Sequence, residues 1–376
     1  MPTELRAAAA GAWALLLCGC WSNSLPTAQG FIRPLESECP DLPICDNPQA
    51  VHVFSDMNGT FYPRRWQGRI RKSAVRSAKS LYNATASGSQ ARDFVDRGER
   101  ELLAEIAGLQ NAGGRIFILV HGYNNKVEEA DEAFEPLEGM LDLKPADRVI
   151  RFYWDGHTGS GVGGARIWLY AAGNSQLVGS RALRRILERF RDREIYLIGH
   201  SRGTSVILSA LGNPVYAPRF LKETKARARR WKLDPERFMN PPAFDPRGNR
   251  IRVLVAAPAV DRIDFCGSTA QSMANGGPFF CPLEYLRPLP VVSFRYTINE
   301  DDKILNKFLG LSRWFNPTGL GAGKEARPPL RDHYKTMRPH PMPPDRSHAF
   351  AWYVKQRSFC EMLAAEKIAR GGGDCR

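Results

Sequence analysis

The chain has 376 residues and carries 53 Lys and Arg against 39 Asp and Glu, which gives a formal net charge of +14. Hydrophobic residues make up 43% and charged residues 24%, a globular composition that excludes wholesale disorder, collagen and coiled coil. The length fits one large α/β domain or two small ones.

The N-terminus has the features of an export signal. Residues 7–17 are an uncharged apolar run, too short to span a bilayer as a mature helix and typical of a signal-peptide core. The run ends in Leu17-Cys18-Gly19-Cys20, which resembles a bacterial lipoprotein signal with Cys20 as the lipidated residue. We therefore expect a lipoprotein-type signal peptide at 1–19 and a membrane-anchored protein of the bacterial cell envelope. Because Cys18 is unusual in that pattern, ordinary cleavage to a periplasmic or secreted protein is the alternative, and a buried N-terminal helix is less favoured.

Residues 20–50 are rich in Pro, Ser and Asn and are expected to form a tether. Six further cysteines follow Cys20, and an exported chain meets oxidising conditions, so we expect disulfides. Short loops close most often by chance, which favours the pairs Cys39–Cys45, Cys266–Cys281 and Cys360–Cys375. A zinc site is the weaker interpretation, because paired CxxC spacings are missing and the histidines are not clustered with the cysteines.

Apolar runs of strand length alternate with helical stretches from residue 51 onward. The strand-like runs are 50–54, 116–120, 149–153, 195–198, 251–256 and 291–296, and the helical stretches are 92–110, 126–141, 174–191 and 202–211. Runs that are apolar on both faces and separated by helices predict an α/β fold with a mostly parallel sheet covered on both sides. We expect one domain over 51–376. The Pro-rich and basic segment 212–250 interrupts the alternation, either as a lid or as a surface connection with a solvated basic helix.

The strongest motif is Gly199-His200-Ser201-Arg202-Gly203, which lies between a predicted strand and a predicted helix. This context is the one that a nucleophile elbow requires. A sharp turn from strand to helix presents the serine hydroxyl, and crowding two residues before and after the serine favours glycine there. The helix N-terminus then directs its amides at developing negative charge. A tight turn with an inert serine is the alternative.

A second motif, His121-Gly122-Tyr123-Asn124-Asn125, directly follows the predicted strand 116–120. With these two motifs and a later Asp302-Lys-Ile-Leu, residues 115–355 resemble the α/β-hydrolase superfamily. More narrowly, they resemble a poorly characterised family of bacterial α/β-hydrolases. The resemblance implies an α/β-hydrolase fold whose oxyanion donors are the amides of Tyr123 and Arg202. His121 precedes the serine, against the superfamily order of Ser, acid and His, so we expect it to brace the oxyanion loop.

A catalytic serine needs a histidine as base and a carboxylate that orients it. His348 precedes a predicted final helix, which is where the superfamily places its histidine; His333 and then His340 are the alternatives. Asp302 matches the family pattern best among the acids, with Asp301, Asp261 and Asp264 as alternatives. The expected final strand is hard to find in the Pro-rich segment 317–346, where 332–337 is the only short candidate.

The resulting prediction is a serine hydrolase that cleaves ester bonds through Ser201, His348 and Asp302, with no cofactor or metal. Amide or thioester cleavage is also open. The alternative is a hydrolase-fold envelope protein that binds a ligand or partner without turnover. Solvated surface arginines without a dedicated partner are the favoured explanation of the net positive charge. Attraction to anionic lipid or envelope polymer is the second interpretation. Nucleic acid is not expected as a partner.

Overall fold

The computed structural model describes residues 50–63, 89–125, 127–154, 171–272, 281–306, 319–324, 329–373 and 375. The predicted signal peptide at 1–19, Cys20, the tether before residue 50 and the Cys39–Cys45 pair lie outside the described residues.

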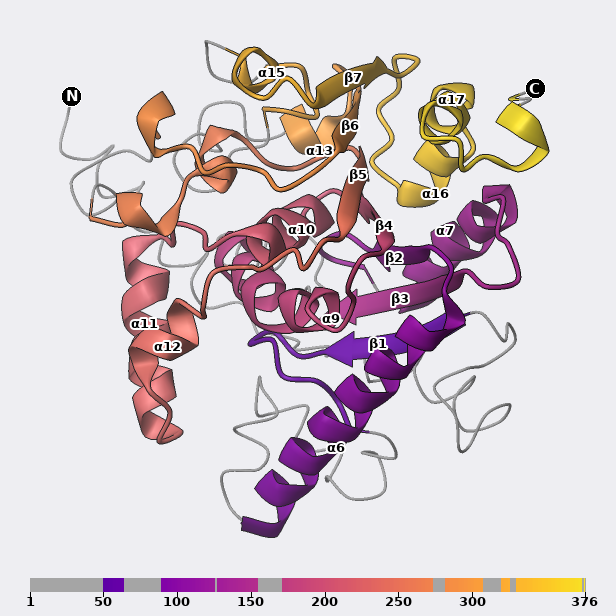
Figure 1. Ribbon diagram of the computed structural model, residues 1–376. Coiled ribbons are helices and arrows are strands. Elements are labelled where there is room, and N and C mark those ends of the chain that lie inside the picture. Colours follow the sequence, from indigo (N-terminus) through magenta and orange to yellow (C-terminus); the bar gives the residue numbers. More distant parts are fainter. Residues whose placement is uncertain are drawn as a thin grey trace, which may run out of the picture.

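A seven-stranded sheet forms the centre of the described part of the chain, in the order β1-β3-β2-β4-β5-β6-β7 with every neighbouring pair parallel (Figure 1). The strands are β1 Ala50–Ser55, β2 Ile116–Val120, β3 Arg148–Trp154, β4 Glu194–His200, β5 Arg250–Ala256, β6 Ser293–Ile298 and β7 Met337–Pro341. The predicted parallel α/β sheet is confirmed.

Successive side chains of strand β2 enter two different hydrophobic cores. Ile116, Ile118 and Val120 belong to one core, whereas Phe117 and Leu119 belong to the core on the other face. All five side chains are buried. Since both faces of a central parallel strand are covered, its sequence is continuously apolar instead of alternating with polar residues.

Helices cover both faces of the sheet (Figure 1). The first core receives side chains from α6 (Ser89–Gly108), from the helical residues 171–187 and from α10 (Gly203–Leu211). The second core receives side chains from α7 (Val127–Met140), α16 (Phe350–Val354) and α17 (Arg357–Ala365). The other α-helices of the described residues are α9 (Arg184–Leu187), which closes the 171–187 stretch, α11 (Pro218–Arg230), α12 (Pro235–Met239), α13 (Lys303–Asn306) and α15 (Leu330–His333).

The final strand differs from the prediction. Residues 330–333 form helix α15, and the strand β7 begins only at Met337, which pairs with Phe294 of β6. The sequence of β7 is Met-Arg-Pro-His-Pro, and its two prolines hide the strand from propensity arguments. Proline cannot donate to a sheet ladder and is therefore tolerated at an edge, which is where β7 lies. The predicted strand at 332–337 is wrong in position.

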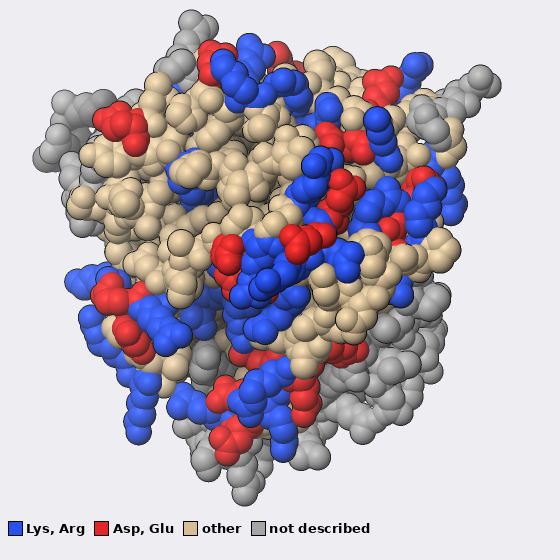
Figure 2. All heavy atoms as spheres, in the orientation of Figure 1, with Lys and Arg blue, Asp and Glu red and all other residues tan. Residues whose placement is uncertain are grey.

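Segment 212–250 folds into the helix pair α11 and α12, drawn at the left of Figure 1. Their apolar sides form a third cluster with Leu177, which includes Phe220 and Trp231. The opposite side of α11 exposes Lys222 and Arg229. Figure 2 shows basic side chains interspersed with acidic ones at the lower left of the molecule, where Figure 1 places α11 and α12.

Two of the predicted disulfides are present, Cys266–Cys281 and Cys360–Cys375, each closing a loop with a sequence separation of 15. Among the described residues, no helix is both long enough and apolar enough to cross a lipid bilayer.

Candidate active site

Ser201 lies at the sharp turn between strand β4 and helix α10. Its φ of +52° is in the left-handed region that non-glycine residues rarely adopt. A Cβ on Gly203 would lie 2.6 Å from the carbonyl oxygen of His121, and one on Gly199 would lie 2.7 Å from Ile207 Cδ1. The crowding predicted at both glycines of the motif is therefore present, and it is more severe at Gly203 because the obstacle there is backbone.

The loop after strand β5 holds the strained turn in place. The Ser201 N–H donates to the Ala256 carbonyl at 2.9 Å, and the Ala259 N–H donates to the Ser201 carbonyl at 3.2 Å. These two bonds fix both peptide groups of the serine, so the surrounding structure compensates the backbone strain.

The Ser201 hydroxyl begins a chain of hydrogen bonds that joins three distant segments. His348 Nε2 lies 2.8 Å from Ser201 Oγ, and His348 Nδ1 lies 2.7 Å from Asp302 Oδ2. Asp302 follows strand β6, and His348 lies in the loop before helix α16. The His348 side chain is 15% exposed, whereas that of Asp302 is fully buried. The structure therefore brings together the three residues that the sequence ranked first.

Asp302 is distinguished from its acidic neighbours by its burial and its partners. Its Oδ1 accepts the N–H groups of Ile304 and Leu305 at 2.9 and 3.1 Å, and Oδ2 also accepts the Tyr353 hydroxyl at 2.8 Å. Asp301 is exposed to solvent. A buried carboxylate that accepts this many hydrogen bonds is held in one orientation.

The alternative residues lie apart from the hydrogen-bond chain that begins at Ser201. His333 is exposed at the end of α15, and His340 in β7 lies 3.2 Å from Arg295 Nη1. Asp261 caps the short 3-10 helix at Arg262–Phe265, and Asp264 forms an ion pair with Arg202. Within the described residues, no group of three or more His, Cys, Asp or Glu side chains is arranged to hold a metal ion.

His121 joins the loop after β2 to the end of β3. Its Nδ1 donates to the Gly122 carbonyl at 2.7 Å, and its Nε2 accepts the Trp154 N–H at 2.9 Å. Burial lowers the pKa of this imidazole to about 4, so the ring is neutral at pH 7. These contacts agree with the predicted bracing role.

His200 anchors the loop that carries His348, a role that its sequence position does not predict. It is buried, and its Nε2 donates to the backbone carbonyl of His348 at 2.9 Å while its ring stacks on Phe350 with a centroid distance of 4.9 Å. Burial is the main reason that the pKa of His200 lies well below the ordinary value. The neutral ring therefore anchors the loop that carries His348. In the sequence, only the position of His200 directly before Ser201 indicates that it lies near the site.

The two predicted oxyanion donors lie on segments that flank the serine. A Cβ on Gly122 would lie 3.0 Å from Ser201 Cβ, so the loop that carries the Tyr123 amide passes directly against the serine. Arg202 occupies the N-cap of α10, where backbone N–H groups have no acceptor within the helix. Donors arranged in this way can stabilise a negatively charged oxygen.

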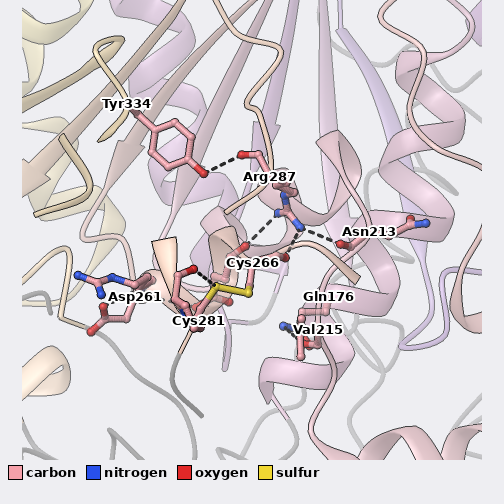
Figure 3. Close-up of a disulfide and its surroundings, with 11 residues drawn as sticks. Gln176, Asn213, Val215, Asp261, Cys266, Cys281, Arg287 and Tyr334 are labelled. Carbon is pink, nitrogen blue, oxygen red and sulfur yellow. Dashed lines mark hydrogen bonds between the residues drawn. A yellow bond between two sulfur atoms is a disulfide. The ribbon is translucent and has the colours of Figure 1, made fainter. Parts of the chain in front are cut away.

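Buried arginines bind the opposite end of helix α10. Arg184 donates to the carbonyls of Ser209 and Ala210 at 2.8 and 2.9 Å. Arg287, shown in Figure 3 beside the Cys266 carbonyl, donates to the Leu208 carbonyl at 2.6 Å. Burial lowers the pKa of Arg287 to about 10. Cations at the carbonyl end of a helix complement its dipole, so both ends of the helix that follows Ser201 are fixed.

Part of the chain matches a known protein family. A family model described as "Alpha/beta hydrolase of unknown function (DUF900)" matches residues 99–280, a range that contains Ser201 and its turn. A comparison with curated proteins found no match. The family match over residues 99–280 and the all-parallel sheet together show an α/β-hydrolase fold.

Proposed function

We propose that this α/β-hydrolase is a serine hydrolase that cleaves carboxylic esters. The observation that carries the proposal is the continuous hydrogen-bond chain from Ser201 Oγ through His348 to Asp302, with distances of 2.8 and 2.7 Å. A base within hydrogen-bond reach of a serine, oriented by a buried carboxylate, is the arrangement that activates this nucleophile.

In the proposed mechanism, Ser201 Oγ attacks the ester carbonyl carbon while its proton moves to His348 Nε2. The carbonyl oxygen becomes an oxyanion, which accepts hydrogen bonds from the backbone amides of Tyr123 and Arg202. Collapse of this intermediate breaks the bond to the alcohol, which leaves with the proton from His348. Water then attacks the acyl-enzyme, His348 takes its proton and returns it to Ser201, and the carboxylic acid is released. Asp302 orients the His348 ring throughout.

The proposal is tested by labelling the purified full chain with a fluorophosphonate probe, which reacts covalently with activated serines. We expect the wild type to be labelled, and Ser201→Ala to lose the label. Ser209→Ala is the matched control, because Ser209 is a buried serine at the far end of the same helix. Labelling that is absent from the wild type, or equal in wild type and Ser201→Ala, would contradict the enzyme and favour a ligand-binding protein without turnover.

Chromogenic esters of increasing chain length, together with matched amides and thioesters, then define the bond that is cleaved, since a Ser-His-Asp arrangement alone does not select the leaving group.

We also propose that the protein is exported and lipid-anchored at Cys20. The two disulfides support export, because such bonds persist in oxidising compartments. Mass spectrometry of the N-terminus of the mature protein tests the anchor: a diacylglyceryl adduct on Cys20 is expected, and an unmodified N-terminus at any other residue would contradict it.

A further inference from the structure

The Arg202 side chain is completely buried behind the serine turn. Its Nη1 donates to the Ala259 carbonyl at 2.8 Å, and its Nη2 lies 3.3 Å from Asp264 Oδ1. Nη2 also donates to the hydroxyls of Ser175 and Ser205 at 3.1 and 2.8 Å. Three segments therefore meet on this one guanidinium: the helix that precedes β4, the loop that follows β5, and the 3-10 helix that carries Asp264.

Asp264 is itself held from several sides. Its Oδ2 accepts the Asp261 N–H at 3.1 Å, and its backbone carbonyl accepts Arg287 Nη2 at 2.9 Å. Arg287 also donates to the carbonyl of Cys266, which is bonded to Cys281 (Figure 3). The 3-10 helix is thus fixed by a capping interaction, a buried arginine and a disulfide, so Asp264 is a rigid anchor for Arg202.

Stability alone does not account for this ion pair. Removing two charges from water costs about as much as their attraction returns, and apolar residues of similar size often stabilise a protein equally well. Burial accordingly lowers the pKa of Arg202, and Asp264 opposes that change. The ion pair lies next to the proposed oxyanion site. The backbone N–H of Arg202 is one of the two proposed oxyanion donors, and the side chain of the same residue is anchored by Asp264.

We propose that the Arg202–Asp264 ion pair is a positioning device that holds the Arg202 amide against the oxyanion, so that it raises turnover without contributing to substrate binding. The inference rests on the proposed function, because the oxyanion exists only during acyl transfer. Asp264 acts through Arg202 and is a positioning residue. The pair also restrains the turn through Ala259, whose N–H binds the Ser201 carbonyl and whose own carbonyl accepts the Arg202 guanidinium.

The test compares Asp264→Asn with Asp147→Asn in the full chain. Asp147 is also buried and paired with an arginine, Arg115, at 2.7 Å, but this pair precedes strands β3 and β2 at the opposite end of the sheet. The measurements are kcat and KM for p-nitrophenyl acetate and the inhibition constant of a trifluoromethyl ketone, whose serine adduct carries an oxyanion. Melting temperatures report the folding of both variants.

We expect Asp264→Asn to lower kcat about 10- to 100-fold and to weaken the ketone by a similar factor, with KM changed less than about threefold. Asp147→Asn should lower the melting temperature and leave kcat and the ketone inhibition constant unchanged. Arg202→Lys, which keeps the charge, should retain more kcat than Arg202→Met.

A folded Asp264→Asn variant with wild-type kcat and ketone binding would overturn the inference and leave the proposed function intact. A wild type that neither reacts with the fluorophosphonate nor turns over any ester would remove the proposed function, and the inference with it. Should Asp264→Asn fail to fold, Ser205→Ala carries the test, because the Ser205 hydroxyl accepts from Arg202 Nη2 at 2.8 Å and donates to Asp264 Oδ1 at 3.1 Å, so that its removal loosens both members of the pair. A matched loss in kcat and ketone binding supports the inference, and unchanged values overturn it.

Discussion

Tyr353 donates its hydroxyl hydrogen to the same Asp302 oxygen that accepts the His348 ring N–H, at distances of 2.8 and 2.7 Å. Tyr353 is buried, and burial, reinforced by the Asp302 charge, raises the pKa of its hydroxyl, which therefore remains a donor. The bond ties helix α16 to the end of β6 and fixes the direction in which Asp302 faces His348.

Tyr353→Phe should therefore reduce both stability and turnover. Loss of a buried hydrogen bond to a charged group costs about 1.5–3 kcal/mol in the free energy of unfolding. We expect kcat to fall less than about tenfold, since the two backbone donors still orient Asp302, whereas Asp302→Asn should cost about 10⁴-fold. Urea unfolding and ester kinetics measure the two effects.

Tyr216→Phe is the control for this prediction. Tyr216 is also a buried tyrosine, and its hydroxyl hydrogen-bonds to the Ser180 hydroxyl at 3.2 Å. Within the described residues, that hydroxyl has no hydrogen bond to Ser201, His348 or Asp302. If the two phenylalanine variants changed kcat to the same extent, Tyr353 would have no specific effect on Asp302.

The two glycines of the serine motif should respond unequally to alanine. A Cβ at position 203 meets backbone oxygen, which cannot move without distorting the oxyanion loop, whereas a Cβ at position 199 meets the flexible end of Ile207. We expect Gly203→Ala to cost about 3 kcal/mol or more of unfolding free energy and Gly199→Ala about 1 kcal/mol.

Gly139→Ala is the opposite case, because Gly139 is an exposed helical residue, and a Cβ at this position would have no neighbouring atom within 4 Å. It should stabilise the protein by about 0.5–1 kcal/mol. Chemical unfolding of the three variants checks the order, and a Gly203→Ala variant as stable as Gly199→Ala would contradict the steric argument.

The buried histidines predict a loss of stability in mild acid. The pKa of His121 is about 4 in the folded protein against 6.5 unfolded, so between these values the unfolded chain binds a proton that the folded chain does not. Above pH 6.5 both states are neutral and the residue has no effect. As the pH falls from 6.5 to 4, the free energy of unfolding should decrease by about 3 kcal/mol from this group, and His200 acts in the same direction.

This prediction is measured by urea unfolding of wild type and His121→Gln between about pH 7 and pH 4.5. The variant should show a smaller decrease over this range, since glutamine does not titrate. Identical slopes for the two proteins would show that the buried ring is not responsible.

The two disulfides provide a matched pair of variants. Both close loops with a sequence separation of 15, for which chain entropy predicts about 3 kcal/mol of stabilisation. Replacing Cys266 and Cys281 by serine should lower both the melting temperature and kcat, because this disulfide fixes the segment that carries Asp264. Replacing Cys360 and Cys375 should lower only the melting temperature. Equal effects on kcat would argue against a connection between the first disulfide and the serine turn.

Much of the fold could be predicted because local signals agree with the tertiary structure. The continuous apolar runs predicted the central strands, since strands covered on both faces have no polar side. β7 was misplaced because its prolines contradict strand propensity, and an edge position is visible only after the sheet is assembled. The cysteine pairs Cys266–Cys281 and Cys360–Cys375 were predicted from loop length and are confirmed.

The sequence by itself determined the turn at Ser201, because the flanking glycines and the change from strand to helix are local properties of adjacent residues. Only the tertiary structure decided which late histidine and which carboxylate approach that serine, since His348 and Asp302 are separated from it by long stretches of chain and meet it only where the carboxyl ends of parallel strands converge. The burial of Arg202 against Asp264 could not be predicted from the sequence either, because nothing in the neighbouring residues distinguishes a buried arginine from an arginine exposed to solvent. Contacts between distant segments depend on how the whole sheet packs, and no local pattern encodes them.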